Sequence, residues 1–526
     1  MEERMYFRNT VRACSICTVI SCLMLFFNCD WDHYALTNTV PAFEKKSSAK
    51  STQVFIACDG LPYAIIDALA QRGELDSHTW QIAPSISPFP SVSSHSWTRI
   101  LRTGSILGYE PSYFDEKKDE LSGGTLFALA QSGIPHVRRF LFDSEKYFAA
   151  IDYSSEGVTD SLVKYVQTQT SIGESLDGLL HFLDGRTLSS ETTTIFFSDL
   201  DVAGHKFGWE TVLEGASAFF HELVKFRDRH PERHIEYTIF SDHGGDFIPS
   251  APDELITTDE FLRAASISAV DSFAAGAALG GDLFAVPVEV LRLSYFGLHT
   301  TPSMAGLAAQ NLSSDPRVDI AISVSNAKPA DQHLATEWVD VWRAGVLEWH
   351  LGYDATHDRY YMSSTGPFLD FGFKIPSIVG PIDSVAEYIV LSDEEAFVLS
   401  EDSEYPDFFS HVRTGVKSST VSNSYEVLVS IRRPYAIAGF TFSKETGVSS
   451  FHGSLSRGST EGIVATTDPN IELPKHMRAD TILDVFPRLR AYLQKTKHTG
   501  YYDSGERTEL DYKLIDQIRS QYSATP

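Results

Sequence analysis

Short apolar runs that end at acidic residues are the clearest pattern along the chain. Three of them, each with the acidic residue that follows it, are residues 54–58 before Asp59, residues 194–197 before Asp201, and residues 237–240 before Asp242. Continuous apolar runs of this length are typical of strands that are covered on both faces. Residues 62–75 then place apolar side chains at helical spacing. This alternation of strand and helix predicts an α/β fold with a mainly parallel sheet flanked by helices.

The acidic residues after these runs are expected to lie close together. In an open α/β sheet, the carboxyl ends of parallel strands meet at one edge, and ligands bind there. We therefore expect Asp59, Asp201 and Asp242 on one rim of the sheet. The pattern does not give the order of the strands.

The later part of the chain has a different hydrophobic pattern and composition. Its main pieces are a helical pattern of small residues at 264–283, a strand-like run at 318–324, and many short strand-like runs at 338–431 with acidic, serine-rich turns such as 392–405. A chain of 526 residues also exceeds one ordinary core. We therefore expect a smaller inserted α+β lobe. The expected parts are a leader at 1–29, a tether at 30–50, a catalytic α/β domain at 51–280, the inserted lobe at 281–433, and a return segment of the catalytic domain at 434–526 with a final helix at 481–494.

The start of the chain predicts export. An arginine-containing stretch at residues 1–12 precedes an apolar run at 13–27, which has the length of a signal-peptide core and is short for a membrane span. Cys29 closes the run like a bacterial lipoprotein acceptor, although Phe27 and Asn28 stand where small residues are usual. Lipidation at Cys29, cleavage nearby and retention as an anchor stay open. The predicted location is periplasmic or at the cell surface.

The net charge limits which partners the chain can bind, and the cysteine content limits which disulfide bonds it can form. The formal net charge is −27, which argues against a nucleic acid duplex as partner because phosphate backbones need clustered Lys and Arg. The same charge repels phosphate esters on average, and bound dications would reverse its sign locally. Only Cys29 and Cys58 lie outside the apolar run of the leader, so a disulfide framework is excluded.

Aspartate and histidine recur in short motifs along the chain. Asp201 and His205 are four residues apart, which on a helix puts both side chains on one face. Asp242 and His243 stand before two glycines after an apolar run, which a core position does not explain. The candidate metal ligands are Asp59, Asp201, His205, Asp242, His243 and His452. Mixed Asp and His ligation favours zinc, or manganese, over magnesium, and two such cations can drive phosphoryl transfer.

The ordered set of motifs resembles a known family. The motifs are Asp59-Gly60, Pro-Ser-Val-Ser to Thr-Gly at 90–104, Asp-Val-Ala-Gly-His at 201–205, Ser-Asp-His-Gly-Gly at 241–245, and His-Gly-Ser-Leu-Ser-Arg at 452–457. In them the chain is similar to the type I phosphodiesterase/nucleotide pyrophosphatase branch of the alkaline phosphatase superfamily. The resemblance implies an alkaline-phosphatase-like fold, two divalent metal ions and a covalent phosphoseryl intermediate that water releases. It also implies the ligands: Asp59, Asp242, His243 and the nucleophile oxygen for one metal, and Asp201, His205 and His452 for the other.

The nucleophile that the resemblance implies is Ser93, with Ser94 as the second choice. The Pro-x-x-Ser spacing from Pro90 and the four-residue step to Trp97 favour Ser93, whereas counting back from Thr103 favours Ser94. Metal coordination lowers the pKa of a hydroxyl, so the serine needs no adjacent histidine base.

The predicted function is hydrolysis of phosphate esters, and the resemblance favours phosphodiester or pyrophosphate bonds. The substrate would be a small-molecule or lipid-headgroup phosphate ester, with membrane contact only through the leader or a lipid. Alternatives within the superfamily are a phosphoethanolamine-type transferase and a phosphomonoesterase. A sulfatase is disfavoured because residues 93–97 lack the Pro and Arg of the sulfatase segment. A non-catalytic surface binding lipoprotein would predict a lost ligand, and all six ligand positions are filled.

Overall fold

A computed structural model gives the fold of the chain. The structure describes residues 51–496 apart from 77, 111, 124–146, 148–150, 156–170, 186–191, 289, 291–292, 326–332, 365–370, 374–383, 386–387 and 438–447. The predicted leader, tether and acceptor Cys29 therefore lie outside the described residues. Among the described helices, none combines the length and apolar character needed to cross a bilayer.

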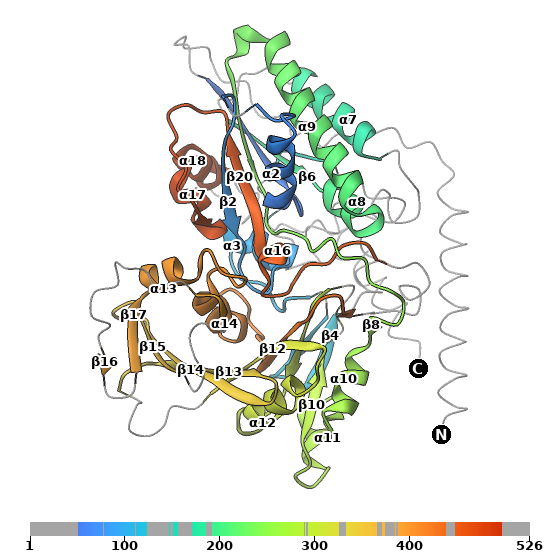
Figure 1. Ribbon diagram of the computed structural model, residues 1–526, viewed down its shortest axis with the longest axis vertical. Helices are drawn as coiled ribbons and strands as arrows, with labels where there is room; N and C mark the ends of the chain where they lie inside the picture. The colour runs from blue at the N-terminus through green and yellow to red at the C-terminus, as the bar shows by residue number, and fades with distance from the viewer. Residues whose placement is uncertain are drawn as a thin grey trace, which may run out of the picture. The chain divides into compact units, whose positions relative to one another are not determined.

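A seven-stranded sheet carries the three acidic strand ends (Figure 1). Its order is β21 (Met477–Arg478), β2 (Gln81–Ile86), β20 (Glu461–Thr466), β7 (Ile235–Phe240), β1 (Thr52–Cys58), β6 (Thr192–Phe197) and β5 (Tyr153–Ser154). Only β20 runs against its neighbours, since it pairs antiparallel with both β7 and β2. The predicted α/β class with a mainly parallel sheet is confirmed. The strand order, with β1 between β6 and β7, is new information.

Helices cover both faces of this sheet (Figure 1). On one face, Val54, Ile56 and Cys58 of β1 share a core with α2 (Tyr63–Gln71), α7 (Ser171–Gly185), α8 (Asp199–Phe207) and α9 (Trp209–Arg229). On the other face, Phe55 and Ala57 share a core with α3 (Ser93–Ile100), α17 (Ile482–Val485) and α18 (Pro487–Thr496). Successive side chains of a strand point to opposite faces, so a strand buried on both faces must be apolar throughout. The continuous apolar run at 54–58 follows from this arrangement.

A second sheet of ten strands is almost entirely antiparallel. Its order is β16 (Ser384–Val385), β17 (Tyr388–Ser392), β15 (Arg359–Ser364), β14 (Val346–Asp354), β13 (Glu337–Arg343), β12 (Val318–Val324), β18 (Val427–Ile431), β11 (Tyr295–His299), β10 (Phe284–Pro287) and β9 (Ser268–Ala269). Its core includes residues of α12 (Pro302–Ser313), α13 (Asp393–Ser400) and α14 (Phe408–Val416). The described residues group as one compact unit, so the boundaries at 281 and 433 stay predictions.

Small elements complete the described structure. They are the pair β3 (Ser112–Asp115) and β4 (Glu120–Gly123), the pair β8 (Leu255–Ile256) and β19 (Ala436–Ile437), helices α10 (Thr258–Ala264), α11 (Phe273–Ala277) and α16 (Arg457–Thr460), and the 3-10 turns η2 (Pro231–Arg233) and η4 (Ala479–Thr481).

Two local predictions are wrong. Residues 264–283 form the strand β9 and only five residues of helix, α11, because Ser266, Gly280 and Gly281 have positive φ angles that interrupt a helix. Residues 392–405 include the helix α13 rather than turns alone. Its start is a capping box, in which Ser392 and Glu395 satisfy each other's backbone N–H groups.

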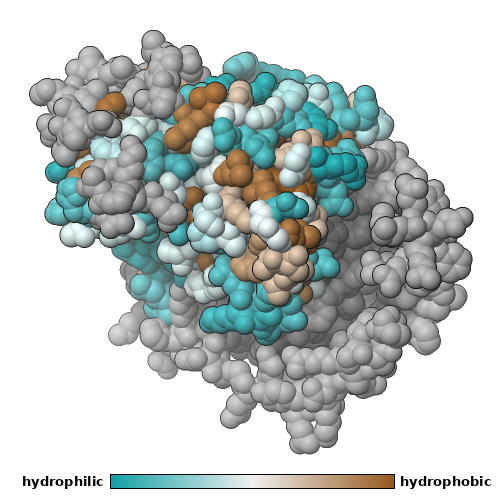
Figure 2. Space-filling model, turned by 90° about the horizontal axis from the view of Figure 1, so that it is seen from below, coloured by the Kyte–Doolittle hydropathy of each residue, from teal (hydrophilic) through white to brown (hydrophobic). Residues whose placement is uncertain are grey.

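Apolar side chains on the surface are scattered. Among the described residues, the large apolar side chains with the greatest exposure include Val346 and Leu307, on different elements of the second-sheet region. Figure 2 shows hydrophobic residues on the face it views, interrupted by hydrophilic ones. Scattered exposure of this kind is ordinary for a folded protein.

Candidate metal centre and nucleophile

The ends of three adjacent strands bring the predicted acidic residues together. The backbone N–H of Asp59 donates to the carbonyl of Phe197 at the end of β6, at 2.9 Å. The N–H of Gly60 donates to Asp242 Oδ1 at 3.2 Å. Asp201 follows β6 on the first turn of α8. The expectation of one acidic rim is therefore met by the geometry.

Gly60 makes the close approach of these segments possible. Its φ is +58°, a conformation that a residue with a Cβ atom rarely adopts. A Cβ atom at this position would lie 2.4 Å from Asp201 Oδ1. The Asp-Gly pair is thus more than a turn, because the glycine leaves room for the carboxylate of Asp201.

The first group of candidate ligands is Asp59, Asp242 and His243, here named the β1/β7 triad. His243 Nε2 lies 3.6 Å from Asp59 Oδ1 and 3.6 Å from Asp242 Oδ2. One ligand atom from each of the three lies within 4.8 Å of the others, and all three side chains are buried. Three such atoms facing one point can hold a single cation.

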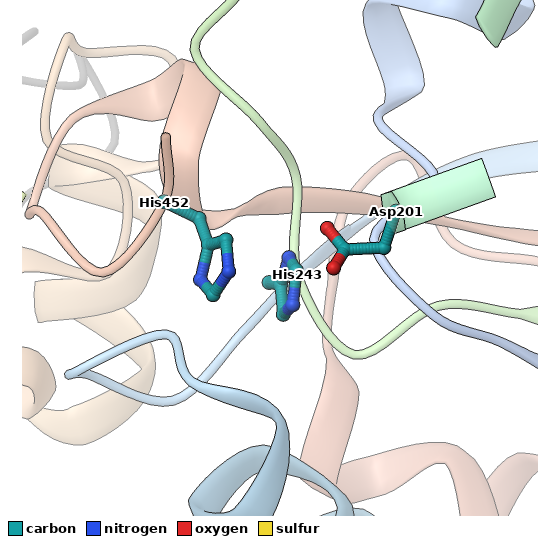
Figure 3. Close-up of side chains that lie close together, drawn as sticks. All are labelled: Asp201, His243 and His452. Atoms are coloured by element: carbon teal, nitrogen blue, oxygen red, sulfur yellow. The ribbon is translucent and has the colours of Figure 1, made fainter. Parts of the chain in front are cut away.

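The second group is Asp201, His205 and His452, here named the α8/loop triad. Asp201 and His205 share one face of α8, as their spacing predicts, with Asp201 Oδ2 3.4 Å from His205 Nε2. The ring of His452 lies 5.2 Å from that of His205 and stacks on that of His243 at 3.8 Å between centroids. Figure 3 shows Asp201, His243 and His452 converging from separate parts of the chain. One ligand atom each of Asp201, His243 and His452 lies within 4.8 Å of the others, so by distance His243 completes this group rather than His205, and the division of the six residues between two ions stays a prediction.

The three imidazoles are oriented in the same way. In each, Nδ1 faces a backbone carbonyl: Gly244 O for His243 at 2.8 Å, Ser450 O for His205 at 2.8 Å, and Ser91 O for His452 at 2.7 Å. A carbonyl oxygen can only accept, so Nδ1 carries a proton in each ring, and in the neutral ring Nε2 keeps its lone pair. Histidines that bind metals typically donate their other N–H in this way.

Ser93 is the serine that the structure places at the centre. It is the first residue of α3, and its Oγ lies 3.1 Å from Asp59 Oδ1 and 3.3 Å from His243 Nε2. Ser91 is fully buried, and its Oγ instead accepts the N–H of Gly453 at 3.0 Å. Ser96 Oγ lies 3.0 Å from Ser87 Oγ. The geometry therefore favours Ser93, and its catalytic role stays a prediction.

Burial and close charges shift the pKa values of the centre. Burial alone would raise the pKa of Asp201, but the three imidazoles around it lower the pKa below its ordinary value. Burial raises the pKa of Asp242 more than His243 lowers it. Burial, and next the neighbouring His243, lower the pKa of His452 well below its ordinary value.

The residues of the centre fit divalent cations. Asp242 is fully buried, and its Oδ2 accepts no hydrogen bond from the described residues. Its burial carries a large desolvation cost that His243 Nε2, at 3.6 Å from Oδ2, offsets only in part, and a bound cation would offset the rest. Carboxylate oxygens together with Nε2 lone pairs are the donor set that zinc and manganese accept.

Neighbouring residues receive structural roles. Trp97 is fully buried and contacts Phe196 and Phe240 edge-on, at the ends of β6 and β7. His95 is also fully buried and packs on Tyr109, while burial and Arg99 lower the pKa of its imidazole to about 3. Both residues pack behind the turn that carries Ser93.

Sequence reasoning missed the residues that hold the His452 loop. Ser91 precedes Ser93 by two residues in the same motif, and its carbonyl orients His452. Ser294, just before β11, donates to His452 O from both its N–H at 2.9 Å and its hydroxyl at 2.8 Å. No local pattern marks such contacts, because each partner is distant in sequence.

Comparisons with known proteins give a structural likeness alone. No family model matches the chain, and no curated protein matches its sequence. Solved structures similar to it include human ectonucleotide pyrophosphatase/phosphodiesterase 5, with 9% identity and a TM-score of 0.42 over 85% of this chain and 95% of that one. The murine protein of the same name gives 8% identity and 0.42, and its inactive variant in complex with AMP gives 8% and 0.41, with the same coverage. These proteins carry the name of the branch that the motifs resemble. At this identity and TM-score the likeness is not evidence for an activity of this chain.

Proposed function

We propose that this chain is a metal-dependent hydrolase of phosphate esters, acting on phosphodiester or pyrophosphate bonds through a covalent phosphoseryl intermediate. The observation that carries the proposal is the common orientation of three imidazoles. Each donates Nδ1–H to a main-chain carbonyl and keeps an Nε2 lone pair, in a cluster with three carboxylates and the Ser93 hydroxyl. A structural core has no need for such an arrangement.

Two divalent ions, zinc or manganese, would be held by the two triads. The β1/β7 triad with the Ser93 oxygen would hold one, and the α8/loop triad the other. When bound, such ions lower the pKa of the coordinated hydroxyl and offset the charge on the phosphate and leaving oxygens. They would also offset the charge of the three carboxylates and of a protein with a net charge of −27.

Ser93 is positioned for attack on phosphorus. Asp59 Oδ1 accepts a hydrogen bond from the Ser93 hydroxyl at 3.1 Å and thereby fixes the direction of the oxygen. The N–H groups of the first turn of α3 lie outside the helical hydrogen-bond ladder and favour an anion at this end. The Ser93 oxygen would form a bond to phosphorus as the bond to the leaving oxygen breaks. Attack by water would then break the serine–phosphorus bond and restore Ser93.

Export is a further part of the proposal. It is supported by the apolar run at 13–27 after an arginine-containing start, and the predicted compartment is the periplasm or the cell surface. The substrate would be a small-molecule or lipid-headgroup phosphate ester.

The test is metal analysis of the purified protein together with turnover of matched esters. We expect bound zinc or manganese, and faster hydrolysis of bis-p-nitrophenyl phosphate than of p-nitrophenyl phosphate. Faster hydrolysis of the monoester would instead support the phosphomonoesterase alternative. Release of product that appears only when an acceptor alcohol is added would support the transferase alternative. A carefully prepared protein without transition metal would contradict the proposal.

A further inference from the structure

Asp246 is a buried carboxylate three residues after His243. It is 5% exposed, and its two oxygens contact different segments of the chain. Oδ1 pairs with Arg433 Nη2 at 2.5 Å, and Oδ2 accepts a hydrogen bond from the Ser456 hydroxyl at 2.7 Å. A buried carboxylate needs such partners, because unpaired charge in the interior is strongly destabilising.

The backbone of Asp246 holds the residue next to His452. Its N–H donates to Phe451 O at 2.7 Å, and its carbonyl accepts the N–H of Phe451 at 3.0 Å, as in a one-residue antiparallel bridge. A second bridge joins Ser250 to Val448. The strand-like contact between 246–250 and 448–451 therefore sets the position from which His452 reaches the centre.

The motifs of His243 and His452 also pack backbone against backbone. A Cβ atom at Gly244 would lie 2.2 Å from Gly458 O. A Cβ atom at Gly458 would lie 2.1 Å from Asp246 Oδ1 and 2.9 Å from Arg433 Nη2. Gly458 thus leaves the space that the pair between Asp246 and Arg433 occupies, and Gly244 leaves the space for the backbone carbonyl of Gly458.

Arg433 connects this arrangement to the second sheet. It lies two residues after β18, and its guanidinium also lies 3.4 Å from Glu404 Oε1, between α13 and α14. Arg457 reaches the same segment, with its guanidinium donating to the carbonyls of Glu401 and Ser403 at 2.6 Å each. The loop after His452 is therefore fastened to the second sheet through these two arginines.

We infer that Asp246 is a positioning residue: through its pair with Arg433 and its hydrogen bond to Ser456, it fixes the His452 loop and so sets the metal affinity of the α8/loop triad. The inference rests on the proposed function. It goes beyond that function because Asp246 contacts no predicted ligand side chain and belongs to neither triad. The inference also implies that contacts to the region of the second sheet, made through Arg433, influence the metal affinity.

The experiment compares Asp246→Asn with Asp407→Asn in the full chain. Asp407 is a matched control, since it is 4% exposed and paired with Arg478 at 2.7 Å, and neither its backbone nor its side chain bonds to the His452 loop in the described structure. Each protein is equilibrated with a series of buffered free Zn²⁺ concentrations, and the bound zinc is measured by mass spectrometry. Thermal unfolding of the metal-free proteins is recorded in parallel.

We expect Asp246→Asn to raise the half-saturating Zn²⁺ concentration of one of two bound ions roughly 10- to 100-fold, the range typical for residues that orient metal ligands. The other ion and both ions of Asp407→Asn should bind as in the unmodified protein. If Asp246→Asn does not fold, Arg433→Met is used instead, because the Arg433 side chain is 36% exposed and its replacement removes the same ion pair; the same shift is expected.

Three outcomes overturn the inference. In the first, the zinc-binding curve of Asp246→Asn, or of its substitute, superimposes on that of the unmodified protein. In the second, the half-saturating Zn²⁺ concentration rises equally in Asp246→Asn and Asp407→Asn, which indicates a general loss of stability. An unmodified protein that binds no zinc overturns the proposed function as well, so the two failures are distinguishable.

Discussion

The two triads of the centre are built in different ways. The β1/β7 triad comes from residues that directly follow two adjacent strands, which are paired over six positions from Thr52 to Ala57. The α8/loop triad takes two residues from one helix and the third, His452, from a segment held by contacts to Asp246, Ser91 and Ser294. The hydrogen bonds between the strands fix the β1/β7 triad, whereas the α8/loop triad depends on the packing of a segment that is distant in sequence. We therefore expect the two halves to respond differently to mutation.

The largest effect should come from removing the predicted nucleophile, the Ser93 oxygen beside the β1/β7 triad. Ser93→Ala removes the hydroxyl beside Asp59 and His243 and is expected to lower kcat for bis-p-nitrophenyl phosphate by roughly 10⁴-fold or more, as for other nucleophile deletions. Steady-state kinetics with Ser94→Ala as the matched control tests this. Activity that survives in Ser93→Ala and disappears in Ser94→Ala would reassign the nucleophile.

Breaking the β1/β7 triad should come next. Asp242→Ala removes a fully buried carboxylate that contacts Gly60 and His243. We expect turnover to fall on the order of 10³-fold, the upper range for lost electrostatic stabilisation, and one of the two metal ions to be lost. Elemental analysis and kinetics on the same sample measure both. Unchanged activity would defeat the assignment of two metals.

Breaking the α8/loop triad should leave the other half intact. His452→Ala removes one ligand and the ring that stacks on His243, and we expect a loss of roughly 10²-fold in turnover. The β1/β7 triad should still bind its ion, so metal content should fall by about half. Loss of both ions in this variant would show that the halves are not separable.

The smallest effect should come from the docking contact itself. Gly458→Ala inserts a methyl group against Asp246 Oδ1, and we expect a destabilisation of ~1–3 kcal/mol, as for overpacking. Gly306→Ala on α12 is the control, because its nearest neighbour is a Trp342 atom at 3.8 Å. The control should be neutral or slightly stabilising. Denaturant unfolding of both variants measures the difference, and equal stabilities would remove the case for tight docking.

The sequence predicts the β1/β7 triad better than the α8/loop triad, for a physical reason. A strand buried on both faces leaves an unbroken apolar run, and the residue after it is at the rim wherever the strand lies in the sheet. Asp59 and Asp242 could therefore be placed together without the strand order. His452 follows no such run. Its position depends on hydrogen bonds to Ser91, Ser294 and the backbone of residue 246, which only the folded chain brings together.

The region of the second sheet is harder to predict from the sequence, again because contacts between distant segments determine it. The helix α13 starts in an acidic, serine-rich stretch whose composition is typical of turns, and only the spacing of Ser392 and Glu395 indicates a capping box. Arg457 ends the motif that contains His452, and its guanidinium binds the carbonyls of the segment at 401–403, which is distant in sequence. Contacts between distant segments, rather than local propensity, determine this region.

The three imidazoles of the centre take their direction from the main chain, since each Nδ1–H is held by a carbonyl oxygen. Every residue type supplies the same carbonyl, so a different side chain at position 91 or 450 still leaves the acceptor that aims the ring, whereas position 244 needs glycine because a Cβ atom there would lie 2.2 Å from Gly458 O. The orientation of these histidines can therefore be inherited through extensive sequence drift in their surroundings, provided that the backbone path is kept.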